Sequence, residues 1–255
     1  MNELRDTLNE SKLKMIEVHL KNNVGLIGGN LSCIDILVVL FHRILNVNDD
    51  SFILSKGHSA LAYYVVLYSL KLITNEDLNS FSKENTNFAG HPSGKKIPGL
   101  LFPTGSLGHG PSLAAGFAYG NQLKNNDKKI FCLCSDGEWQ EGSCWEALIF
   151  ASHHKLNNLT LIIDQNKFQG YGSTNDTVGY DSLLSRITSF NVDAFEINGH
   201  DLEEIEKFLL LKTKNVKVLI CNTVKGNGLR FANTISSHYE KISLDEYEKF
   251  KDSLI

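Results

Sequence analysis

The fold is decided by residues 129–172, which read KIFCLCSDGEWQEGSCWEALIFASHHKLNNLTLIIDQNKFQGYG. Within this stretch, the apolar run 130–134 predicts a buried strand, a turn follows at 136–137, and residues from about 140 to 154 predict a helix. A second apolar run, 159–163, predicts another buried strand. The succession of strand, helix and strand is typical of a parallel unit, so the sequence predicts an α/β fold.

Polar residues directly follow both predicted strands: Asp136 comes after the first, and Asn166 after the second. The carboxyl ends of neighbouring parallel strands open onto one crevice, where ligands of open α/β sheets bind. A carboxylate, an amide oxygen and a nearby backbone carbonyl are hard oxygen donors that suit Mg²⁺ or Ca²⁺. The alternative is that Asp136 belongs only to a turn and Asn166 only to a loop.

The rest of the chain is consistent with one domain, residues 1–255, in which a mostly parallel sheet is flanked by helices. A glycine-rich turn is expected over 25–29, and Pro111 is expected at the first position of a helix. Asp201 is expected to be an N-cap, with Glu204 completing a capping box. Further strands are expected over 52–54, 192–197 and 216–221, and further helices over 5–22, 32–45, 74–81, 111–120 and 201–211, with others ending near 72 and lying near 183.

Composition excludes several classes of protein. Hydrophobic residues make up 42% and charged residues 21% of the chain, as in soluble globular proteins, and the net charge of −4 argues against nucleic-acid binding. No apolar run approaches the length of a membrane span, and no signal-peptide core is present. The odd number of cysteines, mostly within apolar runs, indicates reduced core thiols and a cytoplasmic protein; they are Cys33, Cys132, Cys134, Cys144 and Cys221.

A long loop, 87–110, contains Gly90-His91-Pro92 and the glycine-rich segment 104–108. Loops of this length without secondary structure are usually functional, and their glycines let the backbone approach a ligand closely. Another histidine, His58, follows a predicted strand at a Gly-His turn. By itself such a histidine is consistent with a helix cap or a structural role, although an imidazole can also carry a proton near neutral pH.

The central stretch resembles the thiamine diphosphate motif of the transketolase family. The resemblance rests on Asp136-Gly137-Glu138, then Glu141-Gly142, Trp145-Glu146-Ala147 and, thirty positions after Asp136, Asn166. It implies that Asp136 and Asn166 are Mg²⁺ ligands, with the backbone carbonyl of Phe168 as a third. It also implies that Gly137, Glu138 and Glu141 belong to the cofactor site. The sequence departs from the motif at Ser135, where the family usually has glycine.

Four other segments resemble the same family in order along the chain. They are Lys56-Gly57-His58-Ser59, Gly90-His91-Pro92, Gly105-Ser106-Leu107-Gly108, and 223–228 followed by His238. The resemblance implies catalytic roles for His58, His91 and His238. It further implies cofactor contacts by His58, His238, Gly105, Ser106 and Leu107. Two positions depart from the family pattern: Leu26 stands where a substrate-contacting histidine is common, and His109 stands where glutamine is usual.

The resemblance runs from Gly28 to His238 and covers only the first, diphosphate-binding domain of a transketolase. We therefore expect the N-terminal subunit of a split transketolase. It would transfer a two-carbon ketol unit from a ketose to an aldose, either of which could be a sugar phosphate, with thiamine diphosphate and Mg²⁺ or Ca²⁺ as cofactors. A separate pyrimidine-domain subunit would complete the active site, in an α2β2 assembly.

Two other interpretations stay open from sequence. One is a subunit of a different thiamine diphosphate enzyme, such as a decarboxylating synthase or the α subunit of a 2-oxo acid dehydrogenase. The other is a non-catalytic interaction subunit that retains the cofactor motif as a relic. The presence of both Asp136 and Asn166 argues against the relic.

Overall fold

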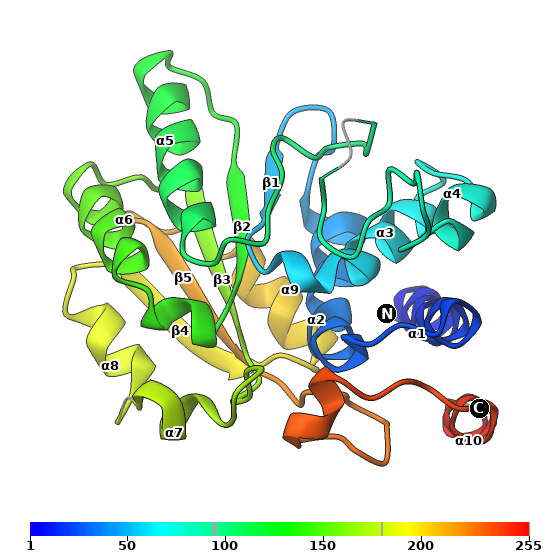
Figure 1. The fold of residues 1–255 in the computed structure, drawn as a ribbon. Coiled ribbons are helices and arrows are strands. Elements are labelled where there is room, and N and C mark those ends of the chain that lie inside the picture. The colour runs from blue at the N-terminus through cyan, green and yellow to red at the C-terminus, as the bar shows by residue number, and fades with distance from the viewer. Residues whose placement is uncertain (94–95, 180, 255) are drawn as a thin grey trace.

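The computed structural model describes residues 1–93, 96–179 and 181–254. Its centre is one sheet of five parallel strands in the order β1-β2-β3-β5-β4, with helices on both faces, as Figure 1 shows. The expected α/β fold with a parallel sheet is confirmed. The strands are β1 (Ser51–Leu54), β2 (Ile130–Ser135), β3 (Leu159–Gln165), β4 (Asp193–Asn198) and β5 (Lys217–Asn222).

One face of the sheet is covered by α5 (His109–Leu123), α6 (Gly142–His153) and α8 (Leu183–Thr188). Alternate residues of β2 point to this face, so Cys132 and Cys134 lie side by side with their Sγ atoms 3.7 Å apart. Small residues of α5, among them Ala114, Ala115 and Ala118, are buried against the sheet. All five cysteines are buried free thiols, as the sequence predicted.

The opposite face is covered by α2 (Ile27–Val39), α3 (Ala60–Ser69) and α9 (Leu202–Leu210). Outside these helices, α1 (Asn2–Asn22) packs against α2 and α3, and α10 (Leu244–Asp252) packs against α1. Every residue of α2 is buried, and a π-helical turn, Leu40–Ile44, extends it. By length and composition, the helical stretch 27–44 could cross a membrane, contrary to the expectation from sequence that no apolar run is long enough. Because 83% of it is buried inside the fold, it has the character of a core helix.

Two predicted helix starts differ from the structure. The glycines of 25–29 were expected to form a turn, but Gly28 and Gly29 lie inside α2, where a Cβ on Gly28 would lie 2.4 Å from the carbonyl oxygen of Ser237. These glycines therefore permit close packing. Helix α5 begins at His109, two residues before Pro111, which proline tolerates because the first helical turn needs no backbone N–H donor.

The helix expected over about 140–154 is divided in two. A 3₁₀ turn, Gly137–Gln140, comes first, Glu141 is extended, and α6 then begins at Gly142. The predicted capping box at α9 is also wrong in part. Asp201 does accept hydrogen bonds from the backbone N–H groups of Glu203 and Glu204, but the Glu204 carboxylate accepts from Asn198 N instead of closing the box.

Short elements complete the described chain. These are α4 (Asn75–Asn79), α7 (Thr174–Val178) and 3₁₀ turns at Gly57–Ser59 and Ile235–His238. Thr74 and Asp77 form a full capping box at α4, consistent with the predicted cap. Between α4 and α5 the described residues contain no further helix or strand, so the long loop expected over 87–110 is present up to Gly108.

Candidate functional site

The sheet brings Asp136 and Asn166 to one edge. Their strands β2 and β3 are paired in parallel, with Ser135 opposite Asp164, so the residues that follow both strands emerge side by side. Both side chains are buried. They lie at the carboxyl ends of the two central strands, where open α/β sheets bind ligands.

Asp136 is held entirely by hydrogen-bond donors. Its Oδ2 accepts from the backbone N–H of Lys167 at 2.7 Å and from the hydroxyl of Thr174 at 3.0 Å, and its Oδ1 accepts from Gly137 N at 2.9 Å. Burial and the nearby Asp164 carboxylate raise the pKa of Asp136 to about 6. In the described part of the chain no lysine, arginine or histidine pairs with it. A bound cation would supply the missing positive charge.

Asn166 and Phe168 add neutral oxygen donors beside this carboxylate. The Asn166 Oδ1 accepts from the backbone N–H of Phe168 at 3.1 Å, while its Nδ2 donates to Asp164 Oδ2 at 3.1 Å. One carboxylate, one amide oxygen and one carbonyl form a donor set that fits Mg²⁺, whose remaining positions water and phosphate oxygens can fill. Among the described residues no cluster of three His, Cys, Asp or Glu side chains offers a softer metal site.

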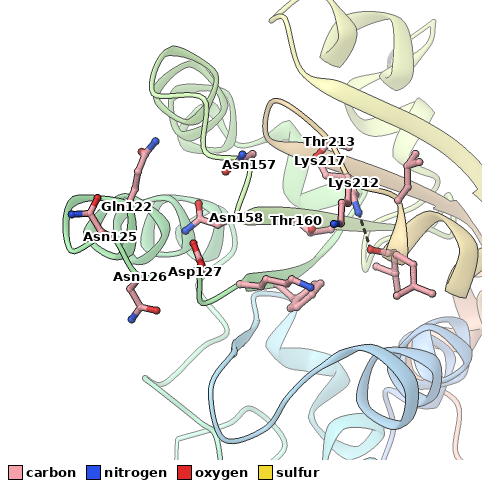
Figure 2. Close-up of a pocket in the computed structure, with 15 residues that line it drawn as sticks. Gln122, Asn125, Asn126, Asp127, Asn157, Asn158, Thr160, Lys212, Thr213 and Lys217 are labelled. Carbon is pink, nitrogen blue, oxygen red and sulfur yellow. Dashed lines mark hydrogen bonds between the residues drawn. The ribbon is translucent and has the colours of Figure 1, made fainter.

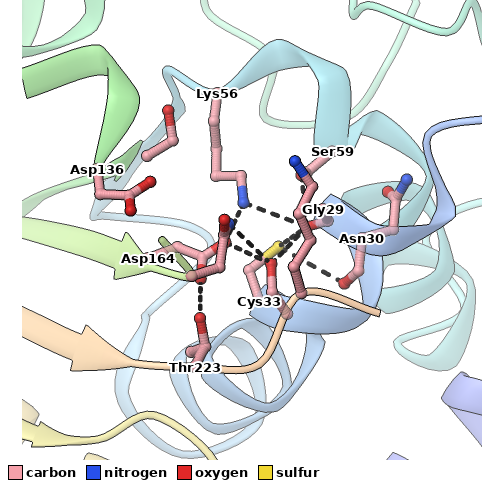
Figure 3. Close-up of polar contacts among 12 residues, drawn as sticks. Gly29, Asn30, Cys33, Lys56, Ser59, Asp136, Asp164 and Thr223 are labelled. Atoms are coloured by element: carbon pink, nitrogen blue, oxygen red, sulfur yellow. Dashed lines mark hydrogen bonds and ion pairs between the residues drawn. The ribbon is translucent and has the colours of Figure 1, made fainter. Parts of the chain in front are cut away.

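Asp164, which accepts the hydrogen bond from Asn166, is the centre of a buried polar cluster (Figure 3). Asp164 forms an ion pair with Lys56 and accepts hydrogen bonds from Ser32 Oγ at 2.5 Å and from Thr223 Oγ1. The Lys56 ammonium lowers the pKa of Asp164, although burial alone would raise it. This cluster joins α2, the turn after β1 and the loop after β5, and it is in contact with Asn166 through Asp164.

Two histidines and one lysine face the same pocket. The rings of His58 and His238 lie 6.2 Å apart between centroids, and Lys225 Nζ lies 3.3 Å from His238 Nδ1 and donates to the Phe168 carbonyl at 2.9 Å. Burial, followed by the nearby lysines, lowers the pKa of His58 well below its ordinary value and that of His238 to about 4. Both imidazoles are therefore neutral at pH 7 and able to accept or donate a hydrogen bond.

A pocket with a volume of about 270 Å³ joins most of the residues that the sequence singled out. The predicted site residues that line it come from six separated segments of the chain. They are His58, His91, Gly105, Leu107, Asp136, Gly137, Asn166, Phe168 and His238, and Leu26 lines the pocket too. The structure thus brings these residues together; their individual roles stay predictions.

Three predicted residues do not line this pocket. Glu138 is buried behind it, where its carboxylate accepts from Ser55 Oγ, from Gly108 N at 2.8 Å and from Ser135 N at 3.3 Å. It therefore fixes the end of the 104–108 segment. Ser106 lines a separate pocket of about 210 Å³ together with His109, and Glu141 is exposed at the start of α6.

Sequence reasoning missed Lys225 and Asp164 as site residues. Burial and the neighbouring Lys56 lower the pKa of Lys225 to about 8, so its ammonium remains mostly charged at pH 7. Only 2% of Lys225 is exposed. A lysine in a polar loop after a core strand carries no sign of burial. Asp164, in contrast, is a charged residue at the end of an apolar run, and that position could have identified it.

A larger pocket, about 780 Å³, lies at the opposite, amino-terminal edge of the sheet (Figure 2). It contains none of the predicted site residues. Lys217 at its floor is buried and donates to the carbonyls of Phe208 and Leu209, at 3.1 and 2.8 Å. The lysine therefore caps the carboxyl end of α9, which accounts for its burial.

Comparison with known proteins agrees with this geometry. The family model for the thiamine diphosphate-binding domain of transketolase matches residues 5–254. An apulose-4-phosphate transketolase subunit of Phocaeicola vulgatus is 34% identical over 252 residues, covering 94% of this chain and 89% of that protein. The 6-deoxy-6-sulfo-D-fructose transketolase subunit SqwG of Clostridium sp. (strain MSTE9) is 31% identical over 245 residues, covering 91% of this chain and 88% of that protein.

Among solved structures, the transketolase of Campylobacter jejuni is similar along the whole chain. The TM-score is 0.89 and the sequence identity 30%; the similarity covers 100% of this chain and 43% of that one. This chain thus spans less than half of the solved transketolase, but nearly the whole length of relatives that are themselves named as subunits. The chain belongs to the transketolase family, as the N-terminal, thiamine diphosphate-binding subunit of a split transketolase-type transferase.

Proposed function

We propose that the pocket binds thiamine diphosphate through Mg²⁺, with Asp136, Asn166 and the carbonyl of Phe168 as the protein's metal ligands. The observation that supports this most directly is the buried Asp136 carboxylate, which has no cationic partner in the described residues and lies beside two neutral oxygen donors. When bound, the cofactor supplies the carbanion chemistry that amino-acid side chains lack. Lys225 lies where it can contact a diphosphate, since its ammonium already borders the same carbonyl.

The three pocket histidines are proposed to act on the sugar. His58 and His238 are neutral at pH 7 because burial lowers their pKa values, so each can donate one hydrogen bond and accept another. With His91, they line the pocket from three different loops. We assign to them the orientation of substrate hydroxyls and the relay of protons during ketol transfer.

We further propose that a pyrimidine-domain subunit covers the exposed face of α5 and α6, in an α2β2 assembly. Phe117 is 41% exposed and Leu113 40% exposed, and an added Cβ at Gly116 would meet no atom within 4 Å. Ile149 and Phe150 continue this apolar surface on α6. A face of this kind on a protein with relatives named as subunits supports a partner at this surface.

The donor is proposed to be a ketose with an anionic end group. One relative is named for apulose 4-phosphate and another for 6-deoxy-6-sulfo-D-fructose, and both of these sugars carry an anionic group. Leu26, an apolar residue, also lines this pocket. We place the enzyme in the cytoplasm, a proposal supported by its five free, buried thiols.

The metal assignment is tested with the complex of this chain and its co-purified partner. Asp136→Ala removes the one charged ligand, so Mg²⁺-dependent binding of thiamine diphosphate should fall by a factor of about ten or more, and ketol transfer with it. Binding is measured by calorimetric titration with and without a chelator. Asp49→Ala, at an exposed aspartate far from the pocket, is the control. Unchanged cofactor affinity in Asp136→Ala would refute the assignment.

A further inference from the structure

The loop that carries Lys225 is fixed at successive residues. It follows β5, and Thr223 at its start donates to the buried Asp164. Gly226 N donates to the carbonyl of Gly28 at 3.0 Å. Between these two anchors lies Val224, whose backbone N–H donates to Nε2 of His200 at 2.9 Å. His200 belongs to the turn between β4 and α9 and does not line the cofactor pocket.

The hydrogen bond from Val224 determines which nitrogen of the neutral His200 ring carries the proton. An Nε2 that accepts a hydrogen bond carries no proton, so the proton of the neutral ring lies on Nδ1. That atom is 3.5 Å from Oδ2 of Asp35. The Nδ2 group of Asn227 lies 3.3 Å away, but it is itself a donor and does not accept this proton. The backbone N–H of Val224 thus sets the tautomer of the neutral ring, and the Asp35 carboxylate lies on its Nδ1 side.

Asp35 is well placed to hold this histidine. It is buried in α2, and its Oδ1 pairs with Lys12 Nζ at 3.0 Å. Its Oδ2 forms no hydrogen bond in the part of the chain that the structure describes, and it lies 3.5 Å from Nδ1 of His200. A continuous chain of polar contacts therefore runs from Lys12 through Asp35 and His200 to Val224.

We propose that His200 is a positioning residue for the cofactor pocket. By holding the N–H of Val224, it fixes the backbone one residue before Lys225, whose ammonium contacts the Phe168 carbonyl and His238. The inference rests on the proposed function, because it takes this pocket as the site of thiamine diphosphate. His200 contacts neither the cofactor nor the substrate, and acts through the loop.

The test compares His200→Leu with His200→Gln in the assembled complex. Leucine removes the acceptor, so the dissociation constant of thiamine diphosphate in the presence of Mg²⁺ should rise about three- to tenfold, the value of one lost hydrogen bond. Glutamine offers an acceptor and a donor at similar reach and should restore most of the affinity. The loss should appear in the KM for the cofactor and leave kcat at saturating cofactor within about twofold.

A matched control is available in His42, which makes one side-chain hydrogen bond, to Ser69, far from the pocket. His42→Leu should leave cofactor affinity unchanged. His200→Asn, too short to place an acceptor at the Nε2 position, replaces the leucine variant if that fails to fold, and the same weakening is expected. Wild-type affinity in both His200→Leu and His200→Asn would overturn the inference alone. A wild-type complex that binds no cofactor would overturn the proposed function as well.

Discussion

His19, in the last turn of α1, is fully buried. Its Nδ1 lies 3.3 Å from the carbonyl of Val24, its Nε2 has no hydrogen-bond partner among the described residues, and its ring meets Phe81 edge-on. Burial lowers its pKa to about 4. In the unfolded chain, the same side chain takes up its proton near pH 6.5.

This difference predicts a pH-dependent stability. As the pH falls from about 6.5 towards 4, the unfolded state binds a proton that the folded state excludes, so stability is lost in that window. His19→Leu should remove about 1–2 kcal/mol of the decrease in unfolding free energy between pH 7 and pH 5. Urea unfolding of the wild type and of His19→Leu, each at pH 7 and pH 5, measures these decreases in unfolding free energy. Equal decreases would show that His19 is not the titrating group.

At the scale of elements, α2 and the 3₁₀ turn Ile235–His238 approach each other at Gly28. A Cβ there would lie 2.4 Å from the Ser237 carbonyl oxygen. Gly28→Ala should therefore destabilise the chain by about 1–3 kcal/mol and displace His238. Gly116→Ala in α5, where the free chain leaves open space, should stabilise it by about 0.5–1 kcal/mol. Thermal unfolding of the free chain measures the stability of both variants. If Gly28→Ala left the melting temperature unchanged, the close packing at Gly28 would be contradicted.

The elements themselves were largely predictable from sequence. Strands β2 and β3 were identified to within two residues, because their apolar runs end at polar residues. The start of α2 was missed because glycines next to a turn and glycines in a packed helix look alike in one sequence. The ion pair of Lys56 with Asp164, and the bond from Val224 to His200, join residues far apart in the chain, which no local pattern reveals.

At the scale of the whole molecule, the exposed apolar face of α5 and α6 is the surface at which we propose that the partner subunit binds. Phe117→Glu places a charge in this face, so it should abolish ketol transfer and co-purification of the partner subunit. The free chain should stay folded, with only a small decrease in melting temperature, because 41% of Phe117 is already exposed. Glu146→Gln, at an exposed residue of α6, changes charge with little change in shape and is the control. Normal assembly of Phe117→Glu would place the partner elsewhere.

The position of β1 in the sheet has a consequence for how the protein is made. Among the described residues this strand pairs with β2 alone, and residues 55–129 separate the two in the chain. During synthesis from the N-terminus, β1 leaves the ribosome long before β2 is made. Its backbone therefore stays unpaired, and its apolar residues stay exposed, until β2 emerges. Strand β3 can pair with β2 soon after it is made, and β5 then pairs with both β3 and the β4 strand that precedes it by fewer residues. Because β1 leads directly into Lys56 and His58, the pocket that His58 lines is complete only after β1 has paired with β2.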